Sequence, residues 1–147
     1  MTTFAVRILP WAVARPGARA VREAVFVREQ GVPIELEWDE LDASCEHALA
    51  TDAGGAVIGT GRLLPDGRIG RMAVLAEWRG LGVGAAILAA LVARALERDM
   101  RRVTLHAQTH AAGFYAKLGF TTIGETFMEA GIPHVAMARE LAPAARS

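Results

Sequence analysis

The stretch MAVLAEWRGLGVG, residues 72–84, decides how the rest of the chain is interpreted, because it joins a β-prone run to a long apolar pattern. Apolar residues then recur three and four positions apart, which predicts a helix: Ile87, Leu88, Leu91, Val92, Ala95 and Leu96. The first backbone N–H groups of a helix lack intrahelical acceptors and, with the helix dipole, attract an anion. Glycines at positions 80, 82 and 84 let a phosphate approach closely, and Arg79 adds a cation. The turn is therefore a candidate diphosphate site.

Two nucleotide-binding motifs fit this turn poorly. The dinucleotide fingerprint needs G-x-G-x-x-G and an acidic residue at the end of the next strand, whereas the spacing here is G-x-G-x-G and that strand ends in His106-Ala107-Gln108. A Walker loop needs Lys and then Ser or Thr after its last glycine, whereas Ala85-Ala86 follow Gly84. The other alternative is a tight strand-to-helix connection without a ligand. The turn alone leaves this alternative and the diphosphate site open.

Strands and helices are expected to alternate on both sides of the turn. The expected strands are Phe4–Leu9, His47–Thr51, Ala56–Leu64, Arg68–Val74, Val103–Ala107, Phe120–Met128 and His134–Met137. Three helices are expected. The first follows a connection marked by Pro10 and Pro16, has its pattern at Val21, Ala24, Val25 and Arg28, and ends near Gln30-Gly31; the others are the apolar helix after Gly84 and Ala111–Leu118. The three strands between His47 and Val74 predict an antiparallel meander. The order indicates an α/β protein with a mixed sheet, in one domain over residues 1–147.

Composition and charge exclude several classes of function. Of 147 residues 52% are hydrophobic, which is enough for one core, and 16 basic residues balance 16 acidic ones. Without a net field, binding to nucleic acid or to an anionic membrane is not expected. The single cysteine, Cys45, excludes an intrachain disulfide, and the most apolar stretch, 84–96, is too short to cross a bilayer. With no signal-peptide pattern, we expect a cytoplasmic protein.

Two sequence blocks resemble the GNAT N-acetyltransferase superfamily. Residues 72–84 resemble its acyl-CoA motif, whose core is R-x-x-G-x-G or A. Gln108, Ala111 and residues 114–120 resemble its segment N-x-x-A-x-x-F-Y-x-x-x-G-F, with glutamine in place of the usual asparagine. Further matches resemble the small ElaA-like branch: Arg22, Val25-Phe26-Val27, Glu29-Gln30, Pro33, Glu37, Asp39, Asp42, Ala107-Gln108 and Gly131-Ile132-Pro133-His134. The resemblance implies a mostly antiparallel sheet, splayed in the middle and flanked by helices, with the cofactor between the parted strands.

The same resemblance implies an acetyl-CoA-dependent N-acyltransferase in which an amine attacks the thioester directly. The implied cofactor-binding residues are Met72, Ala73, Val74, Arg79, Gly80, Leu81, Gly82, Val83, Gly84 and Gln108. Backbone N–H groups of residues 72–74 would bind the pantetheine amides and the carbonyl oxygen that gains negative charge. Tyr115 matches the position of the general acid that protonates the departing thiolate, although a tyrosine on a helix is otherwise a core residue.

A proton acceptor is also expected, because amines are mostly protonated near neutral pH. Glu29 is one candidate, since a carboxylate at a helix C-terminus opposes the dipole and must be held there for some other reason. Its alternative is an exposed surface residue. His134 is the second candidate, because a Gly-Ile-Pro turn would aim its ring, and its alternative is a hydrogen-bonded structural histidine. Water could also relay the proton.

Other polar groups are assigned no catalytic role. His106 and His110 have H-x-x-x-H spacing but lack the glutamate of a zinc hydrolase, so no metal is expected. Residues 34–46 are expected to form an irregular acidic loop that is solvated, or that attracts a cationic amine if it overhangs the acceptor side: Glu35, Glu37, Asp39, Glu40 and Asp42. Cys45 lacks a paired base and is expected to be a small buried hydrophobe.

The favoured function is transfer of an acetyl or other short acyl group from acyl-CoA to an amine of a small molecule or peptide. The alternatives are a non-catalytic acyl-CoA sensor or interaction protein on the same fold, and a dinucleotide-binding oxidoreductase domain. A homodimer is compatible with the sequence, which leaves the oligomeric state, the acceptor and the acyl chain open.

Overall fold

The computed structural model describes residues 3–37 and 39–141. Within them, a seven-stranded sheet has the order β1-β2-β3-β4-β5-β7-β6. The strands are β1 (Phe4–Pro10), β2 (Glu46–Asp52), β3 (Val57–Leu63), β4 (Arg68–Val74), β5 (Arg102–Gln108), β6 (Thr121–Glu129) and β7 (Ile132–Glu140). Neighbouring strands are antiparallel except for β4 and β5, which are parallel. The expected mixed, mostly antiparallel sheet is confirmed, as is the meander from β2 to β4.

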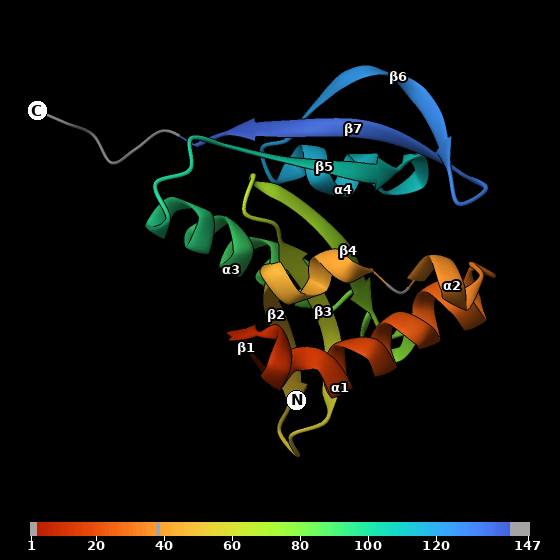
Figure 1. Ribbon diagram of the computed structural model, residues 1–147, viewed down its shortest axis with the longest axis vertical. Coiled ribbons are helices and arrows are strands. Elements are labelled where there is room, and N and C mark those ends of the chain that lie inside the picture. Colours follow the sequence, from red (N-terminus) through yellow and green to blue (C-terminus); the bar gives the residue numbers. More distant parts are fainter. Residues whose placement is uncertain (1–2, 38, 142–147) are drawn as a thin grey trace, which may run out of the picture.

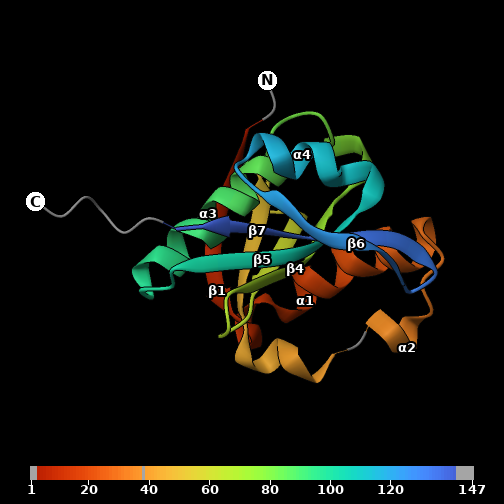
Figure 2. The same ribbon diagram turned by 90° about the horizontal axis from the view of Figure 1, so that it is seen from above.

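Helices cover the sheet (Figure 1). They are α1 (Trp11–Arg22), its π-helical continuation η1 (Glu23–Glu29), α2 (Ile34–Glu37), α3 (Val83–Glu97) and α4 (Ala112–Lys117), with short 3-10 turns η2 (Glu40–Ser44), η3 (Ala76–Trp78) and η4 (Thr109–Ala111). Seen from above, β5, β7 and β6 run across the direction of β1–β3 (Figure 2). The sheet is thus divided into two halves that turn away from each other, and β4 lies at the boundary.

The main core lies between α3 and the sheet. Apolar side chains of α3, among them Ile87 and Leu91, pack against the half of the sheet that consists of β1, β2, β3 and β4. The glycines of β3 allow this close approach, because a Cβ at Gly61 would lie 2.7 Å from Met72 Sδ and 3.0 Å from Ile87 Cγ2. The α3 helix, which was predicted from its apolar spacing, therefore packs closely on β3 and on β4, the strand that leads to the glycine-rich turn.

The first helix begins earlier than expected. Pro10 precedes α1 with an extended backbone, φ −71° and ψ 159°, whereas Pro16 lies inside the helix instead of marking a connection. An interior proline removes one helical hydrogen bond. Ala14, Ala18 and Val21 compensate, because they are at most 1% exposed and form one stripe on the opposite face of the sheet from α3. Burial of this stripe outweighs the local preference of proline.

The acidic segment is not a solvated irregular loop. It forms α2 and η2, and Glu37 and Asp42 are buried at 0% and 2% exposure. Arg22 contacts Glu37 and lies 2.9 Å from Asp42, and Arg62 lies 2.8 Å from Asp42. A charge can be buried when it is paired, and the partners come from α1 and β3, far away in sequence. Burial would raise the pKa of Asp42, but the hydrogen bonds and charges of the two arginines lower it.

Candidate functional site

The sheet is split between β4 and β5. The two strands pair only at Arg68 with Thr104 and at Ile69 with Leu105. Beyond these pairs β4 continues beside β3, and β5 continues beside β7 (Figure 1). The edges of residues 72–74 and 106–108 that face the split therefore pair with no described strand. Backbone N–H and C=O groups on such edges need hydrogen-bond partners, so the split is a natural binding slot for an extended ligand.

A bulge in β4 creates the split. Thr60 of β3 is opposite Ala73, but Arg62 is opposite Gly70, so Arg71 and Met72 together face one residue of β3. Arg71 has φ +50°, which is unusual for a residue with a side chain. A bulge bends the strand that carries it and increases its twist. The bend turns the last residues of β4 away from β5.

The glycine-rich turn follows the bent end of β4 and opens toward the surface. Gly80 and Gly82 have φ of +76° and +86°, and no atom lies within 4 Å of where a Cβ would stand at either position. Gly82 is the N-cap of α3, and among the described residues no side chain caps the helix. The N–H groups of the first turn of α3 are therefore not capped by a described side chain, and the turn beside them is open. These are the features of an anion site at a helix N-terminus.

Gly84 has a different role from its neighbours. It lies within α3, and a Cβ there would lie 3.4 Å from Phe114 Cζ and 3.8 Å from Val74 Cγ2. These are ordinary van der Waals distances, so a Cβ would fit between α3, α4 and the end of β4. Neither packing nor a positive φ therefore requires glycine at position 84, unlike Gly80 and Gly82.

Arg79 and Glu29 bind each other. Arg79 Nη1 and Nη2 donate to the two carboxylate oxygens of Glu29 at 2.8 and 2.6 Å, and Arg79 Nε donates to the Val74 carbonyl at 3.0 Å. This pairing explains how a carboxylate is held at the end of η1 against the helix dipole. The hydrogen bond from Arg79 lowers the pKa of Glu29, which makes Glu29 a weaker proton acceptor. Arg79 therefore links the glycine-rich turn to the end of β4 and to η1, and Glu29 neutralises the charge of Arg79.

Tyr115 projects from α4 into an aromatic environment. Its ring centroid lies 5.0 Å from that of Phe114 and 6.1 Å from that of Phe120, both at steep angles. Burial raises the pKa of Tyr115 to about 12, so the phenol keeps its proton at neutral pH. No described residue forms a hydrogen bond with its hydroxyl group. The proton is therefore available to a ligand, which distinguishes Tyr115 from a core tyrosine whose hydroxyl is satisfied.

His134 lies within β7, because the hairpin turn consists of Ala130 and Gly131, both at positive φ, and Ile132 already belongs to the strand. The expected Gly-Ile-Pro turn is therefore wrong, and strand pairing fixes the ring instead. His134 Nδ1 lies 2.7 Å from the Ile132 carbonyl oxygen, which can only accept, so Nδ1 carries the proton of the neutral ring. Nε2 is then the basic atom. The residue is 6% exposed.

The family follows from comparison with known proteins. Residues 17–141 match the sequence profile described as the acetyltransferase (GNAT) domain. This chain belongs to the GNAT family. It is 42% identical over 124 residues to the uncharacterised N-acetyltransferase YjcF of Bacillus subtilis, covering 82% of this chain and 88% of the relative.

Two solved structures support the GNAT fold. Escherichia coli ElaA has a TM-score of 0.82 and 28% identity, covering 94% of this chain and 100% of ElaA. An acyl-CoA N-acyltransferase from Pseudomonas aeruginosa has a TM-score of 0.81 and 28% identity, covering 93% of this chain and 99% of the other. The resemblance inferred from the two sequence blocks is thus confirmed, and the family uses acyl-CoA as co-substrate.

Glu129 is a neighbour of His134 that was not predicted from the sequence. Its carboxylate lies 2.8 Å from His106 Nδ1 and 3.8 Å from His134 Nε2, and the Phe127 ring stacks on His134 with centroids 6.1 Å apart. The two-residue turn brings Glu129 opposite Ile132, beside His134. Recognising Ala130-Gly131 as the turn would have revealed this neighbour. The carboxylate therefore lies within 4 Å of a ring nitrogen of both histidines.

The side chain of Gln108 contacts Gln30, the residue that follows η1. Its amide exchanges hydrogen bonds with that of Gln30, at 2.9 Å from Gln108 Nε2 and 3.3 Å from Gln30 Nε2. Gln108 is also the register partner of His134, so both side chains lie on the same face of the sheet. The hydrogen bonds to Gln30 therefore hold the side chain of Gln108, the first residue of the GNAT segment, in place.

Cys45 is 4% exposed, and its Sγ donates to the Leu41 carbonyl at 3.1 Å. Burial raises its pKa to about 11, so it is a thiol at neutral pH and not a nucleophile. It lines a surface depression of about 650 Å³ between β1 and α3, which contains none of the predicted GNAT site residues.

Within the described residues, no helix has the length and apolar character to span a bilayer, and no group of three His, Cys, Asp or Glu side chains could hold a metal ion.

Proposed function

We propose that this GNAT protein transfers an acetyl or other short acyl group from acyl-CoA to an amine of a small molecule or peptide by direct attack. One observation carries the proposal: the edge of residues 72–74 that faces β5 pairs with no described strand, and the chain leads from it to the open, uncapped start of α3. An extended amide chain ending in a diphosphate matches this combination of features.

The cofactor would be held mainly by backbone. Those backbone groups of Met72, Ala73 and Val74 that face the split would bind the pantetheine amides and stabilise charge on the thioester oxygen. The turn from Gly80 through Leu81 and Gly82 to Val83 would bind the diphosphate with the N-terminus of α3. Arg79 would support this turn through Glu29 and the Val74 carbonyl rather than supply an unpaired charge.

The amine nitrogen attacks the thioester carbonyl carbon, the C–S bond breaks, and the thiolate takes a proton. We assign that proton to Tyr115, which is protonated well above neutral pH because burial raises its pKa to about 12. We assign the proton of the acceptor ammonium to His134 Nε2, directly or through water. Glu29 is the weaker candidate because Arg79 lowers its pKa.

The experiment compares wild type with Tyr115→Phe, which keeps the ring and removes only the hydroxyl group. Thiol release from acetyl-CoA is followed with a panel of amines, and coenzyme A affinity is measured by calorimetry. We expect turnover to fall by ~10²–10⁴-fold with affinity nearly unchanged. Equal turnover would remove Tyr115 from the mechanism.

Gly82→Glu provides the matching test of the diphosphate site, because it places a side chain and a negative charge in the open turn. We expect it to abolish coenzyme A binding. Binding that is lost in Gly82→Glu, without turnover by wild type for any amine, would favour the acyl-CoA sensor over the enzyme. Thermal stabilisation by NAD and none by coenzyme A would refute both.

A further inference from the structure

Arg71 lies at the bulge where β4 leaves β5, in a backbone conformation that costs free energy for any residue except glycine. Its φ is +50°. Glycine would adopt this conformation without strain, and Gly70 stands directly before it. An arginine at this position therefore calls for a role of its side chain that offsets the strain.

The guanidinium of Arg71 is poorly satisfied. Nη2 lies 3.3 Å from both the Leu36 carbonyl oxygen and Asp39 Oδ2, and its buried Nε has no hydrogen-bond partner among the described residues. Asp39 Oδ2 already lies 2.7 Å from Arg62. The side chain remains 29% exposed, so a ligand can reach it.

The surrounding charges leave Arg71 the least compensated member of its cluster. The cluster contains three arginines and three carboxylates: Arg22, Arg62, Arg71, Glu37, Asp39 and Asp42. Arg22 and Arg62 take the close contacts, whereas Arg71 has one ion pair, at 3.3 Å. Burial and the charges of Arg62 and Arg22 lower the pKa of Arg71, and they outweigh the charges of Asp39 and Glu37, which raise it. Glu37, Asp39 and Asp42 are thus paired with arginines, and the carboxylates of the acidic segment without an ion pair among the described residues are the exposed Glu35 and Glu40.

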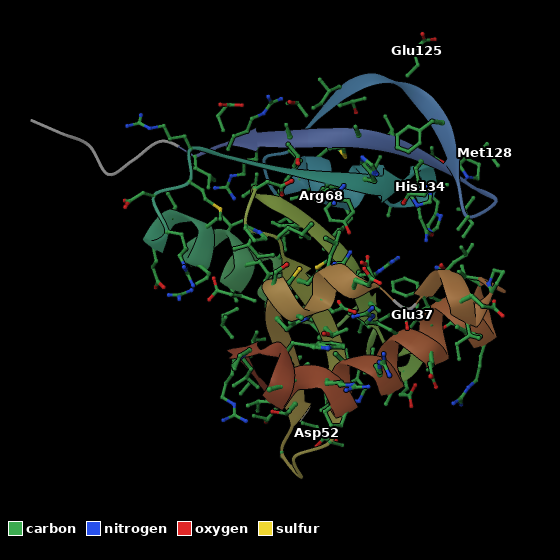
Figure 3. All side chains as sticks on the ribbon, in the orientation of Figure 1. Glu37, Asp52, Arg68, Glu125, Met128 and His134 are labelled. Carbon is green, nitrogen blue, oxygen red and sulfur yellow. The ribbon has the colours of Figure 1, made fainter. Side chains whose placement is uncertain are left out.

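Arg71 faces the side of the sheet on which an acceptor would meet His134. Its side chain contacts the segment after α1, and Gln108, which shares the face of His134, contacts Gln30 at the end of η1. Figure 3 shows His134 on β7 and Glu37, the neighbour of Leu36, on the same side of the molecule. Arg71 also directly precedes Met72, the first residue of the proposed thioester-binding edge.

We propose that Arg71 binds a carboxylate of the acceptor, so that the substrate class is an amine that carries a carboxylate, such as an amino acid. This inference rests on the proposed acyltransferase function. A guanidinium binds a carboxylate through parallel N–H donors, and Nη1 of Arg71 forms no hydrogen bond with a described residue and, unlike Nε, is not buried. Such a contact would hold the acceptor beside the thioester edge on the same sheet face as His134.

The test measures kcat/KM with acetyl-CoA for a panel of amino acids and the matching amino acid amides. Wild type is compared with Arg71→Gly, which removes the side chain and relaxes the backbone, and with Arg68→Ala, which removes an arginine of β4 before the split (Figure 3). The ratio of acid to amide should fall by about 10- to 100-fold in Arg71→Gly, as expected for loss of a charge-assisted pair. It should keep its wild-type value in Arg68→Ala.

An unchanged ratio in a folded Arg71→Gly variant would overturn the inference. If that variant does not fold, product inhibition of wild type decides the question. An N-acetyl amino acid should then inhibit more strongly than its amide, and equal inhibition would overturn the inference. Turnover of amines without any carboxylate preference refutes Arg71 alone, whereas no turnover with any amine refutes the proposed function as well.

Discussion

Replacing Gly82 by alanine tests whether the turn before α3 is built on a backbone conformation that only glycine adopts easily. Gly82 has φ +86°, and a Cβ there would contact nothing within 4 Å. The substitution therefore creates no clash, and its cost is conformational, about 1–2 kcal/mol. For a chain of this size 1 kcal/mol corresponds to roughly 2–4 °C, so we expect the melting temperature to fall by about 2–8 °C.

Gly113→Ala is the matched control, because this glycine also has nothing within 4 Å but lies inside α4 without a positive φ. There alanine should stabilise the protein by about 0.5–1 kcal/mol. Thermal unfolding followed by circular dichroism measures both variants, with and without coenzyme A. Melting temperatures that shift in the same direction would refute the argument, since then the space around each glycine and not its conformation would decide the effect.

Three further predictions follow from the pairings in the structure. Arg22→Met should destabilise the fold by about 3–5 kcal/mol, measured by urea unfolding, because it leaves Glu37 buried without a cationic partner and Asp42 with Arg62 alone. A loss below about 1 kcal/mol would contradict this. Partial burial would raise the pKa of Asp39, but Arg62, the Leu41 N–H and Arg71 lower it to about 2. Ionised Asp39 therefore contributes to the stability of the fold above about pH 4, and this contribution is lost as the pH falls toward 2. The acid side of the stability curve should accordingly be shallower in Asp39→Asn, and identical curves would exclude Asp39. Turnover should fall more in His134→Gln than in Glu29→Gln, because Arg79 lowers the pKa of Glu29, and the reverse order would make Glu29 the proton acceptor.

Patterns local in sequence were enough to predict the seven strands, α3 and α4, but not the start of α1, nor α2 and η2 in the acidic segment. The apolar spacing in α3, the turn residues between β2 and β4, and the glycine after α4 each act over a few residues, and the structure has these elements where they were expected. Pro16 is the instructive exception. Proline disfavours a helix interior locally, but the stripe of Ala14 and Ala18 is buried against strands whose arrangement no local pattern specifies.

The polar part of the site could be predicted only as a set of residues. Glu29 and Arg79 are fifty positions apart in sequence, and Gln30 and Gln108 are seventy-eight apart. Which carboxylate meets which cation is decided by strand order and by the bulge at Arg71, and neither leaves a periodic signal. The sequence therefore singled out Glu29 and Arg79 as candidate residues, a base and a cation, but could not predict that they bind each other.

These two long-range pairs have a common consequence for the split. Glu29 and Gln30 are consecutive at the end of η1, yet Glu29 holds the turn that follows β4 and Gln30 holds the end of β5. One short stretch of chain thus touches both sides of the opening between the strands. The β4 bulge separates the strands, and the end of η1 limits how far apart their ends can move. A substitution at Gln30 would therefore be expected to alter cofactor binding without touching the cofactor, because it would release β5 while β4 stays fastened through Arg79.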